Sequence, residues 1–143
     1  MTPSVEVHIE VPRGSFAKRD AARRLEFLSP LPCPFNYGAV PALAGADHDA
    51  LDAVVLGPRL ALGTRLRCPV QAVVRFIDAD QEDDKLICAA HPLTAGDERL
   101  VLGFFRVYAL AKRLHNVLRG VRGRTRCGGF GDVAAVLARA ARR

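Results

Sequence analysis

Residues 46–56 read ADHDALDAVVL, a polar stretch with three aspartates that runs directly into a short apolar segment. The apolar segment, 53–56, is followed by Gly57 and Pro58, so we interpret it as a short buried strand preceded by a loop. Carboxylates at these offsets can point into one pocket, and Mg²⁺ and Mn²⁺ prefer such hard oxygen ligands. Aspartate is also common in solvated turns, so this pattern by itself leaves both interpretations open.

Further short strands are predicted on both sides of this stretch. Residues 4–12 alternate apolar and polar side chains, which is typical of a half-buried strand. A proline-rich loop at 29–34 leads to a short strand expected at 35–41. Residues 66–76 alternate loosely and favour one bent strand or a strand pair, with Pro69 marking an edge or a bulge.

The second half of the chain changes from strand to helix patterns. An acidic run, IDADQEDD at 77–84, predicts a turn before another strand at 85–90. From 97 to 119 apolar residues recur at helical spacing, which predicts one amphipathic helix. The recurring positions are Leu100, Phe104, Val107, Ala111, Leu114 and Leu118. Asp132 is then the expected N-cap of a final helix that runs to Arg143.

Strands first and helices last predict an α+β fold. We expect a single domain spanning residues 1–143, with a small closed or curled OB-like β-barrel and two C-terminal helices packed against it. No apolar run reaches the length of a membrane helix and the start of the chain lacks a signal pattern, so a cytoplasmic protein without a membrane partner is expected.

The distribution of charge points to a cation site. The chain carries a net charge of +6, yet seven of its ten aspartates lie between Asp47 and Asp84. Like charges held together repel unless a cation neutralises them. The four cysteines are dispersed without a C-x-x-C pair, which favours free thiols over a zinc site or a disulfide framework.

Five segments resemble, in the same order, the motifs of one known family. They read IEVPRGSFAK (9–18), CPFNYGAVP (33–41), ADHDALDAVVL (46–56), DADQEDDKLICAA (78–90) and FFRVYAL (104–110). They are similar to IEIP-x-G-S-x-x-K-Y-E, YPxNYGFIP, DGDPLDVLVL, D-E-x-G-x-D-x-K and FFxxYK of the soluble (family I) inorganic pyrophosphatases. Each motif is weakly specific, but five in register are hard to obtain by chance. The chain is identified as a short, divergent member, and the resemblance covers residues 5–110 well.

The resemblance implies Mg²⁺-dependent hydrolysis of pyrophosphate to two phosphates by a metal-activated water, with Mn²⁺ as an alternative metal. It implies that Asp47, Asp52, Asp78 and Asp83 bind the metal ions directly. It implies that Glu10 and Asp20 contact water molecules bound to the metal ions. It implies Asp49 as the general base, with Tyr37 and Lys85 beside it as catalytic residues. Phosphate contacts are implied for Lys18, Tyr37, Lys85 and Tyr108, and a homo-oligomer is implied, the hexamer being usual in bacteria.

Several positions depart from the family pattern, and most of these departures reduce the number of side chains expected to contact phosphate. Cys33 replaces a tyrosine, Leu25 lies where an arginine is usual, and Ala109 replaces the lysine after the FFxxY tyrosine. Ala79 also replaces a glutamate of the second acidic motif, and Arg113 is a candidate to restore positive charge. One alternative is therefore a homologue with weak or lost activity.

A second alternative is a basic OB-like module that binds nucleic acid or another polyanion. Seven arginines in the last 25 residues favour it on charge alone. The arginine-rich runs at 118–126 and 138–143 lack the interleaved aromatic residues on which bases stack, so nucleic acid is the less favoured partner.

Overall fold

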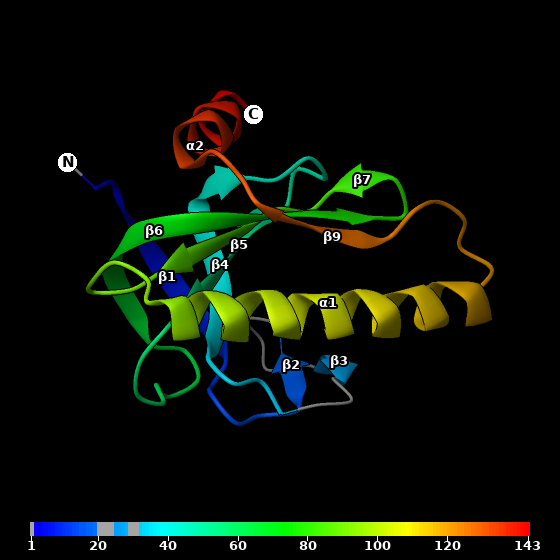
Figure 1. Cartoon of the computed structure of the whole chain (residues 1–143), viewed down its shortest axis with the longest axis horizontal. Helices are drawn as coiled ribbons and strands as arrows, with labels where there is room; N and C mark the ends of the chain where they lie inside the picture. Colours follow the sequence, from blue (N-terminus) through cyan, green and yellow to red (C-terminus); the bar gives the residue numbers. More distant parts are fainter. Residues whose placement is uncertain (1, 20–24, 29–31) are drawn as a thin grey trace.

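Five strands close into a β-barrel in the computed structural model, which describes residues 2–19, 25–28 and 32–143 (Figure 1). Around the barrel the strands pair in the order β1, β4, β5, β8 and β6, and β6 returns to β1. Only β5 and β8 are parallel among these barrel pairs. The strands are β1 (Ser4–Val11), β4 (Asn36–Ala44), β5 (Ala50–Val55), β8 (Lys85–Cys88) and β6 (Arg65–Asp78).

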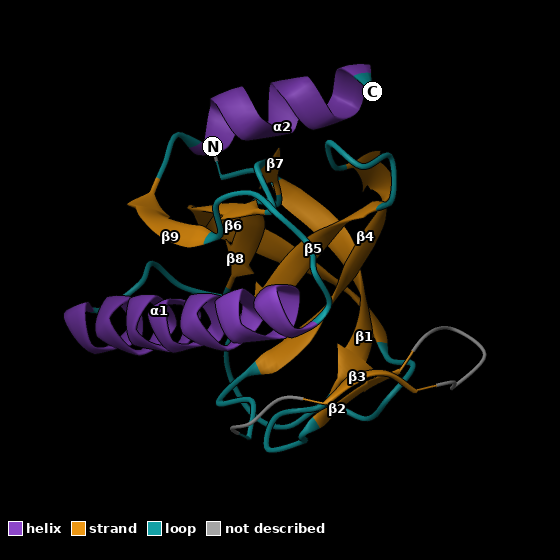
Figure 2. Cartoon of the chain, turned by 90° about the vertical axis from the view of Figure 1, so that its right-hand side faces the viewer, coloured by secondary structure: helices purple, strands orange, loops and turns teal. Residues whose placement is uncertain are grey.

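The remaining elements surround this barrel (Figure 2). Strands β7 (Gln81–Glu82) and β9 (Arg126–Phe130) pair with β6, while β2 (Ala17–Arg19) and β3 (Leu25–Leu28) form a separate hairpin. Helix α1 (Ala95–Leu118) runs along the barrel wall, and α2 (Val133–Arg142) lies across one end. The predicted α+β fold, an OB-like barrel with two packed helices, is confirmed.

The alternation of strand residues gives the barrel two apolar surfaces, and each helix covers one. Val7, Val40 and Leu86 belong to a cluster that α2 completes with Val136 and Ala140. The alternate set packs against α1 on the outer wall. In that second cluster the residues from strands and helix are Val54, Val74, Phe76, Ile87, Val101, Phe105 and Ala109. The second cluster fixes α1 against the outer wall of the barrel.

The row of residues that predicted α1 is not the row that packs on the barrel. The helix buries Val101, Phe105 and Ala109, whereas Leu100, Val107, Leu114 and Leu118 of the predicting row are between 42% and 77% exposed. The helix carries apolar residues on two faces. The face bearing Phe105 packs on the rings of Phe35 and Phe76, and Phe104 of the predicting row borders it against Phe35. Periodicity indicated the helix correctly but could not select its buried face.

Several predicted boundaries shift in the structure. Asp52 lies inside β5 and not in the loop before it, because the strand begins at Ala50. Residues 66–76 form part of a single 14-residue strand, β6, whose register shifts between Val70 and Ala72. The sequence patterns missed β9, which lies within residues 120–131, the connection between the two helices that is rich in glycine and arginine. The expected N-cap is confirmed, since the Asp132 side chain accepts a hydrogen bond from Ala135 N.

The Asn-Tyr-Gly segment of β4 holds the barrel wall together next to the site. Gly38 faces Ile9 of β1 so closely that a Cβ there would overlap the carbonyl oxygen of His8. Asn36 is fully buried, and its Oδ1 accepts from the backbone N–H groups of Arg13 (3.1 Å) and Leu60 (2.8 Å). Only the tyrosine of this segment therefore remains to face the site.

Candidate active site

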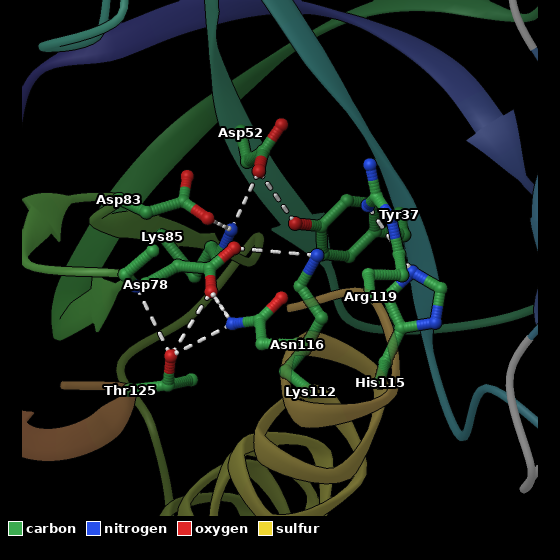
Figure 3. A network of polar contacts seen from close by, with 11 residues as sticks. Tyr37, Asp52, Asp78, Asp83, Lys85, Lys112, His115, Asn116, Arg119 and Thr125 are labelled. Carbon is green, nitrogen blue, oxygen red and sulfur yellow. Dashed lines mark hydrogen bonds and ion pairs between the residues drawn. The ribbon is translucent and has the colours of Figure 1, made fainter. Parts of the chain in front are cut away.

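Asp52 and Lys85 are register partners on the neighbouring parallel strands β5 and β8. The Nζ of Lys85 lies 2.6 Å from Oδ2 of Asp52 and 2.9 Å from Oδ2 of Asp83, so one ammonium group bridges two carboxylates (Figure 3). The hydroxyl of Tyr37, on β4, donates to the same Oδ2 of Asp52 at 2.8 Å. Lys85 is only 1% exposed, and its Nζ lies 5.9 Å and 5.4 Å from the ring centroids of Tyr37 and Phe76.

Burial and charge fix the protonation states of this group. Burial lowers the pKa of Lys85, but Asp52, Tyr37, Asp83 and Tyr108 together outweigh burial, and the net pKa is raised well above its ordinary value. Burial, reinforced by the Asp52 charge, also raises the pKa of Tyr37 well above 10. Burial raises the pKa of Tyr108 to about 12. At neutral pH the lysine is therefore a cation and both phenols are hydrogen-bond donors.

Asp78, at the end of β6, forms the second part of the site. Its Oδ1 accepts from Asn116 Nδ2 at 2.9 Å and from Thr125 Oγ1 at 3.1 Å, while its Oδ2 faces Lys112 Nζ at 3.3 Å (Figure 3). Burial raises the pKa of Asp78, but the Asn116 hydrogen bond and the Lys112 charge outweigh it, so the net pKa is lowered. Asn116 and Thr125 thus hold one carboxylate oxygen of Asp78, and the long, flexible side chain of Lys112 holds the other.

Both parts of the site open into one cavity of about 450 Å³. Among the described side chains, eight acidic ones line it: Glu10, Asp47, Asp49, Asp52, Asp78, Glu82, Asp83 and Asp84. Three basic side chains from the same part of the chain line it as well, namely Lys85, Lys112 and Arg143. A strong excess of negative charge in a cavity of a protein with net charge +6 indicates a site for cations.

The structure brings most of the sequence-predicted site residues to this cavity. Tyr37, Tyr108 and Glu10 line it together with the aspartates. Asp47 and Asp49 are exposed on its rim, in the loop before β5, where Asp47 Oδ1 accepts from Asp49 N at 3.0 Å. Lys18 lies on β2, but its side chain is outside the described part of the chain, and Asp20 is outside the described residues.

The chemistry of the donors fits divalent metal ions. Within the described ranges, no three His, Cys, Asp or Glu side chains are grouped tightly enough to hold a metal as they stand. Instead, the ammonium groups of Lys85 and Lys112 lie on the oxygens of Asp52, Asp83 and Asp78 that a metal would bind. Carboxylate oxygens gathered in one cavity are the ligands that hard divalent cations such as Mg²⁺ prefer.

The sequence-based prediction missed several residues of the site, among them Lys112, Asn116, Thr125 and Arg143. The helical repeat carried a signal for two of them, because positions four and eight after Tyr108 share its face of α1. Arg113, the expected replacement cation, does not line the cavity; its Nε donates to the carbonyl oxygen of Thr125 at 2.6 Å.

The acidic run 77–84 is not uniformly solvated, because Asp84 is buried. Its Oδ1 accepts from Arg75 Nε and from Phe76 N, each at 3.1 Å. Asp80 remains exposed in the β6–β7 turn and pairs with Arg124. Further ion pairs join Arg139 to Asp84 and Arg143 to Glu82, so part of the C-terminal arginine charge is neutralised within the chain.

Comparisons with known proteins show the family to which the chain belongs. The family model described as inorganic pyrophosphatase matches residues 7–101. An inorganic pyrophosphatase of Haemophilus influenzae is 34% identical over 92 residues, which cover 59% of this chain and 52% of that protein. One of Streptomyces coelicolor is 30% identical over 123 residues, covering 72% of this chain and 76% of that protein. The chain spans about half the length of several relatives, including the Haemophilus protein.

Solved structures share the fold. An inorganic pyrophosphatase from Neisseria gonorrhoeae matches with a TM-score of 0.75 at 23% identity, covering 98% of this chain and 90% of that one. The Thermus thermophilus enzyme matches with a TM-score of 0.74 at 24% identity, covering 96% and 87%. No helix among the described residues is long and apolar enough to cross a membrane.

Proposed function

The chain belongs to the inorganic pyrophosphatase family, and we propose that it hydrolyses pyrophosphate to two phosphates with Mg²⁺ as its cofactor. The observation that carries this proposal is the acidic cavity in which a buried lysine bridges Asp52 and Asp83. Pyrophosphate is strongly anionic, so a nucleophile reaches it only where its charge is neutralised. When bound at these carboxylates, the metal ions supply that neutralisation and make water more acidic.

Each of the cavity residues then has a proposed role. Asp47, Asp52, Asp78 and Asp83 hold the metal ions, with Glu10 and Asp20 orienting water around them. Lys85, with Tyr37 and Tyr108, donates to phosphate oxygens, because all three groups are protonated at neutral pH. Lys18 is proposed as a further phosphate contact. Mn²⁺ is the alternative cofactor, and the proposed location is the cytoplasm.

Asp49 is the proposed general base. Its exposed position on the cavity rim leaves the carboxylate accessible to a water molecule, whose proton it takes as that water attacks phosphorus. Its backbone N–H is held by the Asp47 carboxylate, which limits the movement of the loop. No covalent intermediate with the protein is needed.

The test is phosphate release from pyrophosphate by the purified protein, with Mg²⁺, with Mn²⁺ and with a chelator. We expect release that depends on the metal and that falls about 10²- to 10⁴-fold in Asp49→Asn. Asp80→Asn is the matched control, because Asp80 is also an exposed aspartate but pairs with Arg124 outside the cavity. Release at background level with every metal would contradict the enzymatic proposal and favour the homologue that has lost turnover.

We also propose that the chain forms a homo-oligomer through the outer face of α1. Exposed Leu100, Val107, Leu110, Leu114 and Val117 recur at heptad spacing along that face. Arg99, Arg106 and Arg113 flank the row on one side, while Phe104, Ala111 and Leu118 lie on the other. In a parallel pair of such helices each arginine faces an uncharged residue of the second copy, so like charges do not meet. A second copy is therefore the proposed partner, and a hexamer is one such assembly.

Sedimentation velocity across a range of protein concentrations tests self-association. Leu110→Gln combined with Leu114→Gln is expected to dissociate the assembly, because burying two polar amides in an apolar contact is unfavourable. Phe130→Gln, another exposed apolar side chain but on β9, serves as the control. A monomer at every concentration, or an assembly unaffected by the double variant, would contradict this interface.

A further inference from the structure

Lys112 faces the cavity from the last turns of α1, next to a carboxylate that the proposed function assigns to metal. Its Nζ lies 3.3 Å from Oδ2 of Asp78, and its side chain is mostly buried. It follows Tyr108 by four residues, so both side chains lie on the same face of the helix. It is also one of only three lysines in a chain in which arginine is the usual cation.

Ala109 lacks a positive charge that similar sequences have at this position, and Lys112 supplies a positive charge nearby on the same helix. Ala109 stands where a lysine follows the aromatic motif in similar sequences, and here it is buried against the barrel in contact with the Phe105 cluster. A lysine at that position would place its stem among these apolar residues. Lys112 lies one helical turn further and already reaches the cavity. The positive charge is thus displaced along α1 by about one turn.

The hydrogen bonds of Asp78 determine which of its oxygens is available to a metal ion. Oδ1 of Asp78 is held by Asn116 and Thr125, which leaves Oδ2 as the oxygen directed to a cation. A metal ion at Oδ2 competes with the Lys112 ammonium group for that oxygen. The flexible four-carbon stem lets the ammonium group move by a few ångströms within the cavity.

We propose that Lys112 is a phosphate-binding residue of this chain, held on Asp78 in the metal-free protein and transferred to a substrate phosphate oxygen when metal occupies Asp78. The inference rests on the proposed function for the identity of the anion. In this proposal Lys112 supplies a phosphate contact in place of those that are lost because Cys33 and Ala109 stand where similar sequences have a tyrosine and a lysine. Arg143 is less suited to this exchange, because its guanidinium also binds the Ala44 carbonyl and Glu82 outside the predicted metal set.

Calorimetric binding of imidodiphosphate, a pyrophosphate analogue with a nitrogen bridge, tests the proposal in the presence of Mg²⁺. Lys112→Met keeps the apolar stem but removes the charge, and we expect it to weaken analogue binding about 10- to 100-fold. Lys112→Arg retains a cation and is expected to restore most of the affinity. Arg122→Met, at an exposed arginine beyond the end of α1, is the control, with binding like that of the wild type.

Binding of Mg²⁺ by itself separates a phosphate contact from a structural role. Lys112→Met is expected to bind Mg²⁺ at least as tightly as the wild type, because a competing ammonium group has been removed. Unchanged analogue affinity in Lys112→Met, or a parallel loss of Mg²⁺ affinity, would overturn the proposal. Lys112→Gln provides a second uncharged variant, and thermal unfolding shows that each variant is folded before binding is measured.

The same measurements distinguish failure of the inference from failure of the proposed function. A wild-type protein that binds the analogue through Lys112 but releases no phosphate would refute hydrolysis and leave the Lys112 contact standing. If hydrolysis is observed, Lys112→Met is expected to raise KM for pyrophosphate more than it lowers kcat, because the contact already forms in the bound substrate. A normal KM with normal analogue affinity would refute the Lys112 contact and leave hydrolysis standing.

Discussion

Nζ of Lys85 lies 2.6 Å from Oδ2 of Asp52, and the two residues are direct register partners on the parallel strands β5 and β8. The same ammonium group lies 2.9 Å from Asp83. Without the lysine, two carboxylates would face each other in a largely buried site. Lys85 therefore holds together, in the metal-free protein, the acidic groups that we propose bind metal.

The first prediction concerns stability and its dependence on metal. Lys85→Met is expected to lower the free energy of unfolding by about 3–5 kcal/mol in the presence of a chelator, because removing one partner leaves buried charges uncompensated. Mg²⁺ is expected to restore part of this loss, since it can neutralise Asp52 and Asp83 instead. Guanidinium denaturation with and without Mg²⁺ measures both effects. An equal loss under the two conditions would argue against metal binding at these carboxylates.

The second prediction concerns the two tyrosines, the only ones in a chain without tryptophan. Burial raises the pKa of Tyr37 well above 10 and that of Tyr108 to about 12. Ultraviolet absorbance is therefore expected to show no phenolate signal near pH 10 in the folded protein. In guanidinium both tyrosines are expected to titrate near their ordinary pKa of 10.

The sign of the linked stability change follows from these pKa shifts. The folded state holds the phenolic protons more tightly than the unfolded state, so this contribution to stability is complete below pH 10 and is lost as the pH rises towards 12. Phenolate absorbance and loss of circular dichroism are expected to rise together in that interval. A full phenolate signal at pH 10 from a folded protein would contradict the buried positions of both rings.

The third prediction concerns Asn36, whose buried amide joins three segments of backbone. Its Nδ2 donates to Pro58 O at 2.9 Å and to Val55 O at 3.3 Å, in addition to the two bonds accepted by Oδ1. Asn36→Ala is expected to lower the free energy of unfolding by about 2–4 kcal/mol, because buried backbone groups lose their partners. Denaturant unfolding measures it. Gln71→Ala, which removes a single bond to Ala89 O, is the control and is expected to cost about 1 kcal/mol.

The fourth prediction concerns the tight turn between β6 and β7. Ala79 and Asp80 form a two-residue connection, with φ angles of 50° and 66°. A side chain with a Cβ is strained in this left-handed region, so Ala79→Gly is expected to stabilise the protein by up to about 1 kcal/mol. Ala90→Gly, in an exposed bend without a positive φ, is expected to be neutral or destabilising. Melting temperatures that fall in both variants would contradict the strain.

Many of the helices and strands could be predicted from the sequence, because local patterns of residues specify them. Period-two alternation gave β1, the N-cap at Asp132 gave the start of α2, and a helical repeat gave α1. The buried face of α1 was not accessible, since both apolar faces have helical spacing and only packing against Phe35 and Phe76 distinguishes them. Strand β9 was missed because glycine and arginine, with little strand preference, form it through pairing with β6.

The sequence by itself determined the family, the barrel class and which aspartates to look for around a cavity, because the types and order of these residues are local properties of the chain. Only the tertiary structure decided how Asp52 was to be placed. It lies within a strand, paired to a buried Lys85 from 33 positions further along the chain. It also decided that Lys112 reaches the cavity and Arg113 does not. Neighbouring helix residues point in different directions, and which of them meets Asp78 depends on how α1 is rotated against the barrel.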